Sequence, residues 1–255
     1  KYIQKYQAES GSIVLVEAKS GNILSMANYP SFDPEKRQTY RGIKIKNRAI
    51  YDLIEPGSTI KPFIIYAALR NKVIDKSTII DTAPGVIKLD NKEIKDWKYL
   101  GKVSTSDIIK LSSNIGAAKV SKKLSKKQLI RNLDSFGFGQ SLFLNLPGSK
   151  NGSVPSHNSL SDSNHFSIGY GYGLSVSLMH LVNAYTMLAN AGSQTQLKYI
   201  TNTDSADKKQ VLDMQISNTV LDMMREVVHS PDGTGKKASV NAVSYTHLRA
   251  HETAC

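Results

Sequence analysis

The chain has 255 residues, a formal net charge of +12 and a hydrophobic content of 40%. This length suits one large domain or two small ones with a buried core. The longest apolar run, PFIIYAAL (residues 62–69), is too short to span a membrane. A basic chain suggests nucleic-acid binding, but the lysines are scattered, and the densest cluster (residues 120–131) is typical of one amphipathic helical face. We therefore expect no nucleic-acid partner.

The cysteine content and the two ends of the chain restrict the kinds of site and of protein that the sequence allows. The single cysteine is Cys255, which excludes disulfides and thiolate metal sites. RAHETAC (residues 249–255) lacks the histidine spacing of a metalloprotease helix, so we expect no metal site there. The polar N-terminus has no initiator Met and no secretory signal, so we expect a fragment whose targeting segment lay upstream.

A β-hairpin is predicted near the N-terminus. GSIVLVEAKSGNILSMANYP (residues 11–30) alternates, breaks at the turn-forming residues 19–22, and ends at Tyr29-Pro30. From Ser58 the apolar period changes to that of a helix buried on most sides. Pro62 is compatible with this helix if it lies in the first turn.

Short strands and further helices follow. Residues 72–103 are predicted to form irregular structure and short strands, with Pro84-Gly85 as a turn. Residues 104–124 form a second helical region that opens on a Ser-Thr-Ser-Asp cap. The next helix opens with a capping box, Ser125 to Gln128, and closes at Gly137.

The last third of the chain is predicted to contain a long loop and two helices. Residues 145–173, rich in Gly, Ser, Asn and Pro, are predicted to be the loop. Residues 175–192 form a periodic helix closed by Gly192, and residues 217–228 form another with Ser217 as its N-cap. A hairpin followed by helices indicates a mixed α+β fold.

EPGSTIKPF (residues 55–63) places Ser58 and Lys61 one helical turn apart. Residues at i and i+3 share a helix face, so the hydroxyl and the amine can meet. Burial and a helix N-terminus both disfavour a protonated lysine, and a neutral lysine can activate serine for acyl transfer. The same spacing in SADK (residues 205–208) and the ordinary role of serine as an N-cap make the pattern weak alone. The sharp Pro56-Gly57 turn and the apolar run that buries Lys61 favour catalysis.

LSSN, with Ser112 and Asn114, is the second candidate element. A hydroxyl near the Ser58–Lys61 pair could relay a proton to a leaving amine, and an amide could hold the lysine and a substrate carbonyl. Two other Ser-x-Asn triplets begin at Ser20 and Ser156. The position of LSSN between two helical runs favours this one, although Ser113 and Asn114 could simply cap the next helix.

Several motifs resemble those of class B penicillin-binding proteins, the D,D-transpeptidases of bacterial wall synthesis. They are NRAIYDLIEPGSTIKPF (residues 47–63), LSSNIGAAKVS (111–121), FGFG (136–139), SIGYGYGLSVSLMHL (167–181) and LANAG (188–192). GYGYGLSVS and EIKDW (residues 93–97) are most similar to the septal, FtsI-like members. The resemblance spans roughly residues 9–242, with the motifs in family order. It implies the penicillin-binding or serine β-lactamase-like transpeptidase fold, an antiparallel sheet with a helical subdomain.

The resemblance also implies a mechanism and a setting. Ser58 would be the acylated nucleophile and Lys61 the general base, with Ser112 and Asn114 as proton relay and substrate holder. The substrate would be a peptidoglycan stem peptide ending in D-Ala-D-Ala, and β-lactams would acylate the same serine. Divisome membrane proteins would be partners. The domain would face the periplasm, anchored to the inner membrane by an N-terminal helix that this chain does not contain.

The sequence departs from the family after SPDGTGKKASV (residues 230–240), where a Lys-Thr-Gly strand is expected and absent. Residues 244–255 fit neither the family nor a core strand. We therefore expect residues 1–243 to form a transpeptidase domain that lacks its last strands, and residues 244–255 to be a non-native tail. The missing strand would supply an oxyanion donor, worth roughly 10²–10³ in rate, so we expect the chain as given to be inactive.

Two alternatives stay open. A β-lactamase or β-lactam-sensor domain shares the Ser-x-x-Lys helix, but hydrolysis needs a water-activating group and no acidic residue in the sequence argues for one. A non-catalytic divisome assembly module would keep the fold for partner binding. The retained Ser58, Lys61, Ser112 and Asn114 argue against that second alternative.

Overall fold

The computed structural model describes residues 2–36, 38, 45–89, 92–142, 146–199 and 209–239. Its α-helices are α1 (Tyr2–Lys5), α2 (Arg48–Tyr51), α3 (Lys61–Arg70), α4 (Thr105–Lys110), α5 (Asn114–Lys123), α6 (Lys126–Ser135), α7 (Asp162–Gly169), α8 (Leu178–Ala189) and α9 (Met214–His229). Its 3₁₀ turns are η3 (Gly57–Ile60) and η4 (Lys236–Ala238). Its strands are β1 (Gly11–Glu17), β2 (Asn22–Tyr29), β3 (Ile79–Asp81), β4 (Val86–Leu89), β5 (Lys92–Lys95), β6 (Lys102–Ser104), β7 (Ser193–Gln194) and β8 (Lys209–Gln210).

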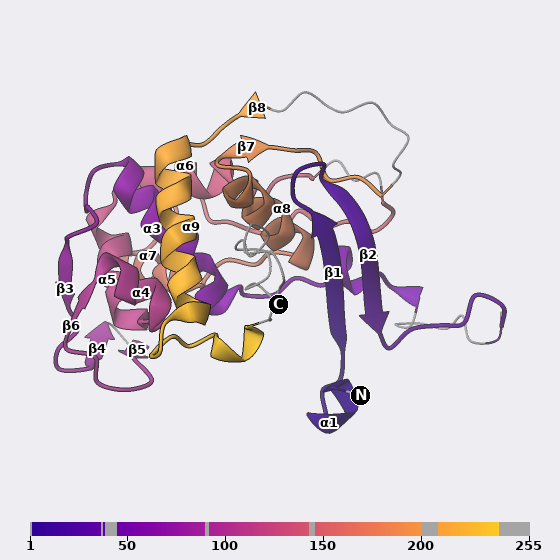
Figure 1. Ribbon diagram of the computed structural model, residues 1–255, viewed down its shortest axis with the longest axis horizontal. Coiled ribbons are helices and arrows are strands. Elements are labelled where there is room, and N and C mark those ends of the chain that lie inside the picture. The colour runs from indigo at the N-terminus through magenta and orange to yellow at the C-terminus, as the bar shows by residue number, and fades with distance from the viewer. Residues whose placement is uncertain are drawn as a thin grey trace.

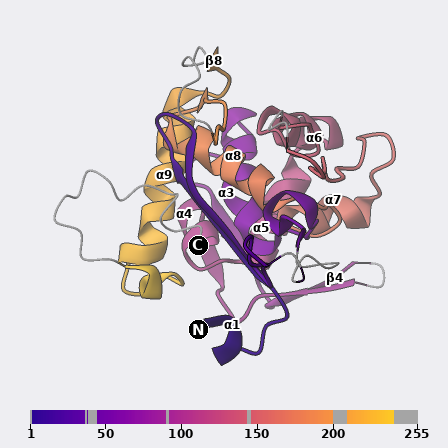
Figure 2. The same ribbon diagram turned by 90° about the vertical axis from the view of Figure 1, so that its right-hand side faces the viewer.

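The hairpin β1–β2 stands at one side of a helical body, and strands β3 to β6 lie at the opposite side (Figure 1). Figure 2, seen from the hairpin side, shows the two strands crossing in front of the helices. Val14 and Val16 of β1 pack in a cluster with Met179 of α8. The same cluster contains Ala49 and Ile50 of α2, so the hairpin rests on α2 and α8.

The predicted hairpin is confirmed. β1 pairs antiparallel with β2 from Gly11 opposite Tyr29 to Glu17 opposite Asn22, with an irregularity after Leu15. Side chains alternate along β1, so Ile13 and Leu15 lie on its more exposed face while Val14 and Val16 pack in the cluster with Met179. This alternation is what the period of two in the sequence predicts.

Helix α3 is the centre of the core, as the change of period at Ser58 predicts. Eight of its ten residues, from Lys61 to Ala68, are buried. The Phe63 ring meets the rings of Phe136, Phe138 and Tyr185 edge to face, at centroid distances of 4.8–5.2 Å. A buried aromatic of this kind contributes about 1.5–3 kcal/mol through burial alone, so these contacts fix α3 against the segments that surround it.

The remaining strands within the described residues are short antiparallel pairs, β3 with β6, β4 with β5, and β7 with β8. The predicted short strands of residues 72–103 are thus confirmed, with Pro84-Gly85 in a turn. The capping box of Ser125 and Gln128 on α6 is also confirmed, and Gly137 follows α6 with a left-handed φ of +85°. The mixed α+β class is confirmed by these elements together.

Two local predictions are wrong. Residues 145–173 are not one long loop, because α7 occupies Asp162–Gly169 and packs its buried His165, Ile168 and Gly169 inward. The last predicted helix does not begin at Ser217. Its N-cap is Asp213, whose carboxylate accepts the Ile216 N–H, and Ser217 is buried inside α9 with its hydroxyl donating to the Asp213 carbonyl.

Within the part of the chain that the structure describes, no helix is both long and apolar enough to cross a bilayer.

Candidate active site

Ser58 lies in the turn η3, which leads directly into α3 at Lys61. Gly57 adopts a left-handed φ of +55°, and its N–H donates to the Gly171 carbonyl at 3.1 Å. The Glu55 carboxylate accepts the Gly173 N–H at 2.9 Å. These two bonds tie the turn to the loop that follows α7, and Ser58 itself remains exposed.

Ser112 and Asn114 come from the break between α4 and α5. Ser112 has a φ of +56°, which is uncommon for a residue other than glycine and turns the chain sharply between the two helices. Ser113 is the N-cap of α5, and its hydroxyl accepts the Gly116 N–H at 2.8 Å. The expected cap role therefore belongs to Ser113, and its neighbours Ser112 and Asn114 are left to face η3 and α3.

The structure brings all four predicted residues together around the Lys61 amine. Lys61 Nζ lies 3.0 Å from Ser58 Oγ, 2.9 Å from Ser112 Oγ and 2.8 Å from Asn114 Oδ1. It also lies 2.7 Å from the Ser112 carbonyl oxygen. The Ser112 hydroxyl donates to Ser58 Oγ at 3.0 Å, which completes a ring of three groups.

The hydrogen-bonding capacity of these groups indicates which contacts can exchange a proton. The Ser112 carbonyl and the Asn114 amide oxygen can only accept, so each takes an N–H of Lys61. A neutral amine has two N–H groups and one lone pair. With both N–H groups so engaged, the lone pair is left for the hydroxyl proton of Ser58, because the Ser112 hydroxyl proton points to Ser58 Oγ. The site can therefore hold an uncharged lysine without an unsatisfied polar group.

Burial favours this uncharged state. The Lys61 side chain is 1% exposed. Desolvation lowers the pKa of Lys61 to about 7, and the negative charge of Asp96 opposes part of that shift. Near neutral pH a large share of Lys61 can therefore accept a proton.

The orientation of the Asn114 amide is set by the segment that ends β5. Asn114 Nδ2 donates to the Lys95 carbonyl at 2.9 Å, which leaves Oδ1 for Lys61. Asp96 follows directly and accepts the N–H groups of Asn114 and Ile115. Residues 95–96 thus lie on the far side of the second motif from Lys61.

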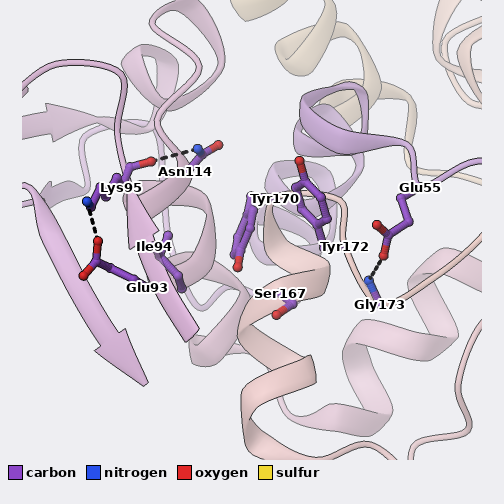
Figure 3. A pocket seen from close by; sticks show the side chains of 9 residues that line it. All are labelled: Glu55, Glu93, Ile94, Lys95, Asn114, Ser167, Tyr170, Tyr172 and Gly173. Carbon is purple, nitrogen blue, oxygen red and sulfur yellow. Dashed lines mark hydrogen bonds and ion pairs between the residues drawn. The ribbon is translucent and has the colours of Figure 1, made fainter. Parts of the chain in front are cut away.

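A pocket of about 650 Å³ opens beside Asn114. Figure 3 shows the side chains that line it, with Tyr170 and Tyr172 between the β5 side and the Glu55 side. The two tyrosine rings lie 5.3 Å apart, and Glu93 forms an ion pair with Lys95 at the rim. The lining residues are Glu55, Glu93, Ile94, Lys95, Asn114, Ser167, Tyr170, Tyr172 and Gly173. The pocket leads to the candidate site and can admit a peptide-sized ligand.

The other Ser-x-Asn and Ser-x-x-Lys matches in the sequence do not contribute to this site. Ser20 and Asn22 belong to the hairpin turn, where the Asn22 N–H donates to Ser20 Oγ. Ser156 bonds within its own loop to Ser159. SADK and the predicted tail, residues 244–255, lie outside the described residues. Lys19-Ser20-Gly21, the triplet most like the missing third motif, is part of the hairpin turn.

Sequence reasoning missed the residues that hold the motifs in place. Glu55 and Asp96 each secure a loop, but a single carboxylate before a helix or turn is too common in sequences to identify. In the sequence, Asp96 is marked only by its place in EIKDW. That motif contributes to the family resemblance but does not indicate what Asp96 contacts. Among the described residues, no cluster of three or more His, Cys, Asp or Glu side chains could hold a metal ion.

Comparisons with known proteins agree with one another. The family model described as the penicillin binding protein transpeptidase domain matches residues 11–250. The chain is 34% identical over 93% of its length to peptidoglycan D,D-transpeptidase FtsI of Buchnera aphidicola subsp. Schizaphis graminum, and 32% identical over 92% to FtsI of Escherichia coli K12. It spans 41% and 39% of those relatives, about two fifths of their length. The transpeptidase domain of Burkholderia pseudomallei penicillin-binding protein 3 is similar in structure, with a TM-score of 0.83 at 29% identity over 94% of this chain and 68% of that one.

Proposed function

Because the chain belongs to the family of penicillin-binding protein transpeptidase domains, we propose that it is the catalytic domain of a peptidoglycan D,D-transpeptidase that works through an acyl-enzyme on Ser58. The observation that carries this proposal is the buried Lys61 amine, 3.0 Å from the exposed Ser58 hydroxyl. A serine beside a base of lowered pKa is the arrangement that acyl transfer requires.

In the first half-reaction, Ser58 Oγ forms a bond to the carbonyl carbon of the penultimate D-Ala, and its proton passes to Lys61 Nζ. The peptide C–N bond then breaks. The departing nitrogen of the terminal D-Ala takes a proton through the Ser112 hydroxyl, which lies 2.9 Å from Lys61 Nζ and 3.0 Å from Ser58 Oγ. The products are free D-Ala and a stem-peptide ester on Ser58.

In the second half-reaction, an amine of a neighbouring stem attacks this ester. The amine loses its proton along the same path, and Ser58 Oγ leaves and recovers its own. Asn114 holds Lys61 through Oδ1 and lies at the mouth of the pocket beside the site, so we assign it the additional role of substrate holder. β-Lactams would enter the first half-reaction and remain on Ser58.

The biological setting is also a proposal. The relatives named FtsI support a role in septal wall synthesis. We place the domain on the periplasmic face of a longer protein that an N-terminal helix anchors in the inner membrane, with divisome membrane proteins as partners. No cofactor is required by the steps above.

We further propose that residues 1–243 are an incomplete transpeptidase domain and that residues 244–255, of which the family model still includes 244–250, are a non-native tail. We also propose that this 255-residue chain is inactive by itself. No Lys-Thr-Gly or Lys-Ser-Gly triplet follows Lys61 in the sequence. Without the strand that carries it, the tetrahedral intermediate loses an oxyanion donor, which costs about 10²–10³ in rate.

Labelling with a fluorescent penicillin tests both parts. The product of the complete gene, the 255-residue chain and a Ser58→Ala variant are incubated with the label, and the modified peptide is identified by mass spectrometry. We expect stoichiometric labelling of the complete product at Ser58, none in the variant, and labelling of the 255-residue chain at least about 10²-fold slower. A folded complete product that is never labelled would remove the proposed function. Stoichiometric labelling of the 255-residue chain would remove only its inactivity, and rapid release of the label would point to a hydrolase.

A further inference from the structure

We propose that Asp96 is a positioning residue for the acylation step: its carboxylate holds the Ser112–Asn114 segment against Lys61, and its negative charge acts on that amine across the segment. This inference rests on the proposed function of the same site. It concerns a residue that does not touch the reacting atoms and acts through its neighbours.

One carboxylate makes three hydrogen bonds to the second motif. Asp96 Oδ1 accepts the N–H of Asn114 at 2.5 Å and the N–H of Ile115 at 3.0 Å. Asp96 Oδ2 accepts the hydroxyl of Ser113 at 2.8 Å. These are two of the free N–H groups of the first turn of α5 together with its N-cap side chain, so a negative charge there is also favoured by the helix dipole.

The neighbours of Asp96 on both sides reinforce this attachment. The Lys95 carbonyl accepts Asn114 Nδ2 at 2.9 Å, and Trp97 Nε1 donates to the Leu111 carbonyl at 2.9 Å. Three consecutive residues at the end of β5 therefore hold the whole segment from Leu111 to Ile115. Of the three, Asp96 holds the Ser113 side chain and the backbone of Asn114 and Ile115.

The segment needs this support because its own conformation is unfavourable. Ser112 has a φ of +56°, a conformation that side chains other than glycine seldom adopt without surrounding restraint. Both the Ser112 hydroxyl and its carbonyl contact Lys61 Nζ, at 2.9 and 2.7 Å. If the segment relaxed by about 1 Å, the hydrogen bonds that join Ser58, Lys61 and Ser112 would lengthen and the proton path would be broken. Such displacements cost about 10²-fold in rate.

The charge of Asp96 has an effect separate from its hydrogen bonds. Around Lys61 the structure places Ser58 from η3 and Ser112 and Asn114 from the α4–α5 break, all uncharged. Among the described residues, Asp96 is the charged side chain that acts on Lys61. Its negative charge favours the protonated amine, so its removal makes the amine lose its proton at a lower pH.

Two substitutions separate these effects. Asp96→Asn keeps an oxygen for the Asn114 and Ile115 N–H groups, and its amide can donate to the Ser113 hydroxyl, so the position is largely retained while the charge is lost. Asp96→Ala removes both. Asp75→Asn is the matched control, because Asp75 Oδ1 also accepts three hydrogen bonds, from the Ser77 N–H and the Ser77 and Thr78 hydroxyls, in a loop without a candidate site residue.

The experiment measures the second-order rate constant for acylation by fluorescent penicillin between about pH 5 and pH 9 in the product of the complete gene, with thermal unfolding of each variant. We expect Asp96→Ala to lower the high-pH plateau about 10²-fold. We expect Asp96→Asn to lower this plateau only a few-fold. It should also move the acidic limb, the low-pH part of the profile where the rate constant rises with pH, to lower pH. Asp75→Asn should leave both plateau and limb unchanged.

A structural role of Asp96 as an ordinary helix cap would lower stability without moving the acidic limb. An Asp96→Ala plateau within about threefold of the unmodified protein, or an Asp96→Asn limb at the original pH, overturns the inference. If the unmodified protein is not acylated, the proposed function fails, and amide hydrogen exchange then decides on Asp96. Faster exchange at Asn114 and Ile115 in Asp96→Ala than in Asp75→Asn supports the positioning role, and equal exchange overturns it.

Discussion

Ser58 and Lys61 are one helical turn apart, yet one is exposed and the other buried. This contrast suits their proposed roles, because a nucleophile must reach substrate and a base must lose its proton near neutral pH. The sequence could predict the pairing, since i and i+3 share a face. The contact with Ser112 and Asn114, about fifty positions away, followed only from the position of LSSN and from the family resemblance, because their approach depends on the break between α4 and α5.

The protonation state of Lys61 gives the first prediction. Because the neutral amine is the proposed base and burial lowers the pKa of Lys61 to about 7, most of it is protonated below that pH. The acylation rate constant of the complete gene product should rise about tenfold per pH unit below about pH 7 and level off above it. A penicillin-labelling rate profile measures this directly.

Lys61→Arg is the control for that profile. Arginine keeps its proton at every accessible pH, so the variant should show no such limb and acylate about 10²–10⁴-fold more slowly. Lys119→Arg on α5 makes the same exchange at a lysine whose amine donates to the Asp81 carbonyl instead. It should behave like the unmodified protein. A flat profile with Lys61 intact would show that another group takes the Ser58 proton.

At the scale of elements, the sequence predicted those helices whose signals are local and missed α7, which depends on packing. Ser125 and Gln128 form a capping box that needs no tertiary partner, and the structure contains it. α7 has a weak apolar pattern, and it forms where Gly169 packs against α5. A Cβ at Gly169 would lie 2.7 Å from the Ala117 carbonyl, so only glycine permits this approach. Such a contact is invisible in a loop-like composition.

The loop after α7 supports the turn that carries Ser58, and Gly171 tests that support. A Cβ at Gly171 would lie 1.9 Å from the Gly57 carbonyl oxygen. Gly171→Ala therefore cannot keep the bond between the Gly57 N–H and the Gly171 carbonyl. We expect a loss of more than about 3 kcal/mol in unfolding free energy and acylation at least about tenfold slower. Urea unfolding and penicillin labelling measure the two effects.

Gly148→Ala is the matched control for this change. Gly148 has a similar left-handed φ, +82°, but an added Cβ would meet only Tyr51 Cδ2 at 3.6 Å, an ordinary contact. It should cost about 1–2 kcal/mol from backbone strain and leave acylation of the folded protein unchanged. Equal effects at both glycines would mean that strain, and not the contact between the two loops, explains the Gly171 result.

For the molecule as a whole, the hairpin is the part least covered by the rest of the described chain. β1 pairs with β2 on one edge only. Ile13 and Leu15 on its outward face are 60% and 54% exposed, and they line an apolar groove of about 360 Å³ beside α8. The period of two predicted which β1 side chains alternate. Which face packs in the cluster with Met179, and how much of the other face stays uncovered, depend on the arrangement of distant elements.

An exposed apolar strand with a free edge favours pairing between copies, so the 255-residue chain should self-associate through β1. The double substitution Ile13→Thr with Leu15→Thr should lower that association while changing the unfolding free energy by less than about 1 kcal/mol, because both side chains are mostly exposed. Sedimentation velocity and urea unfolding provide the readouts. Val14→Thr with Val16→Thr changes the same strand on its inner face, in the cluster with Met179, and should instead cost about 1–3 kcal/mol. Unchanged association in the outer-face variant would show that copies do not associate through β1. Equal destabilisation by the two pairs would show that the two faces of β1 are not buried as described.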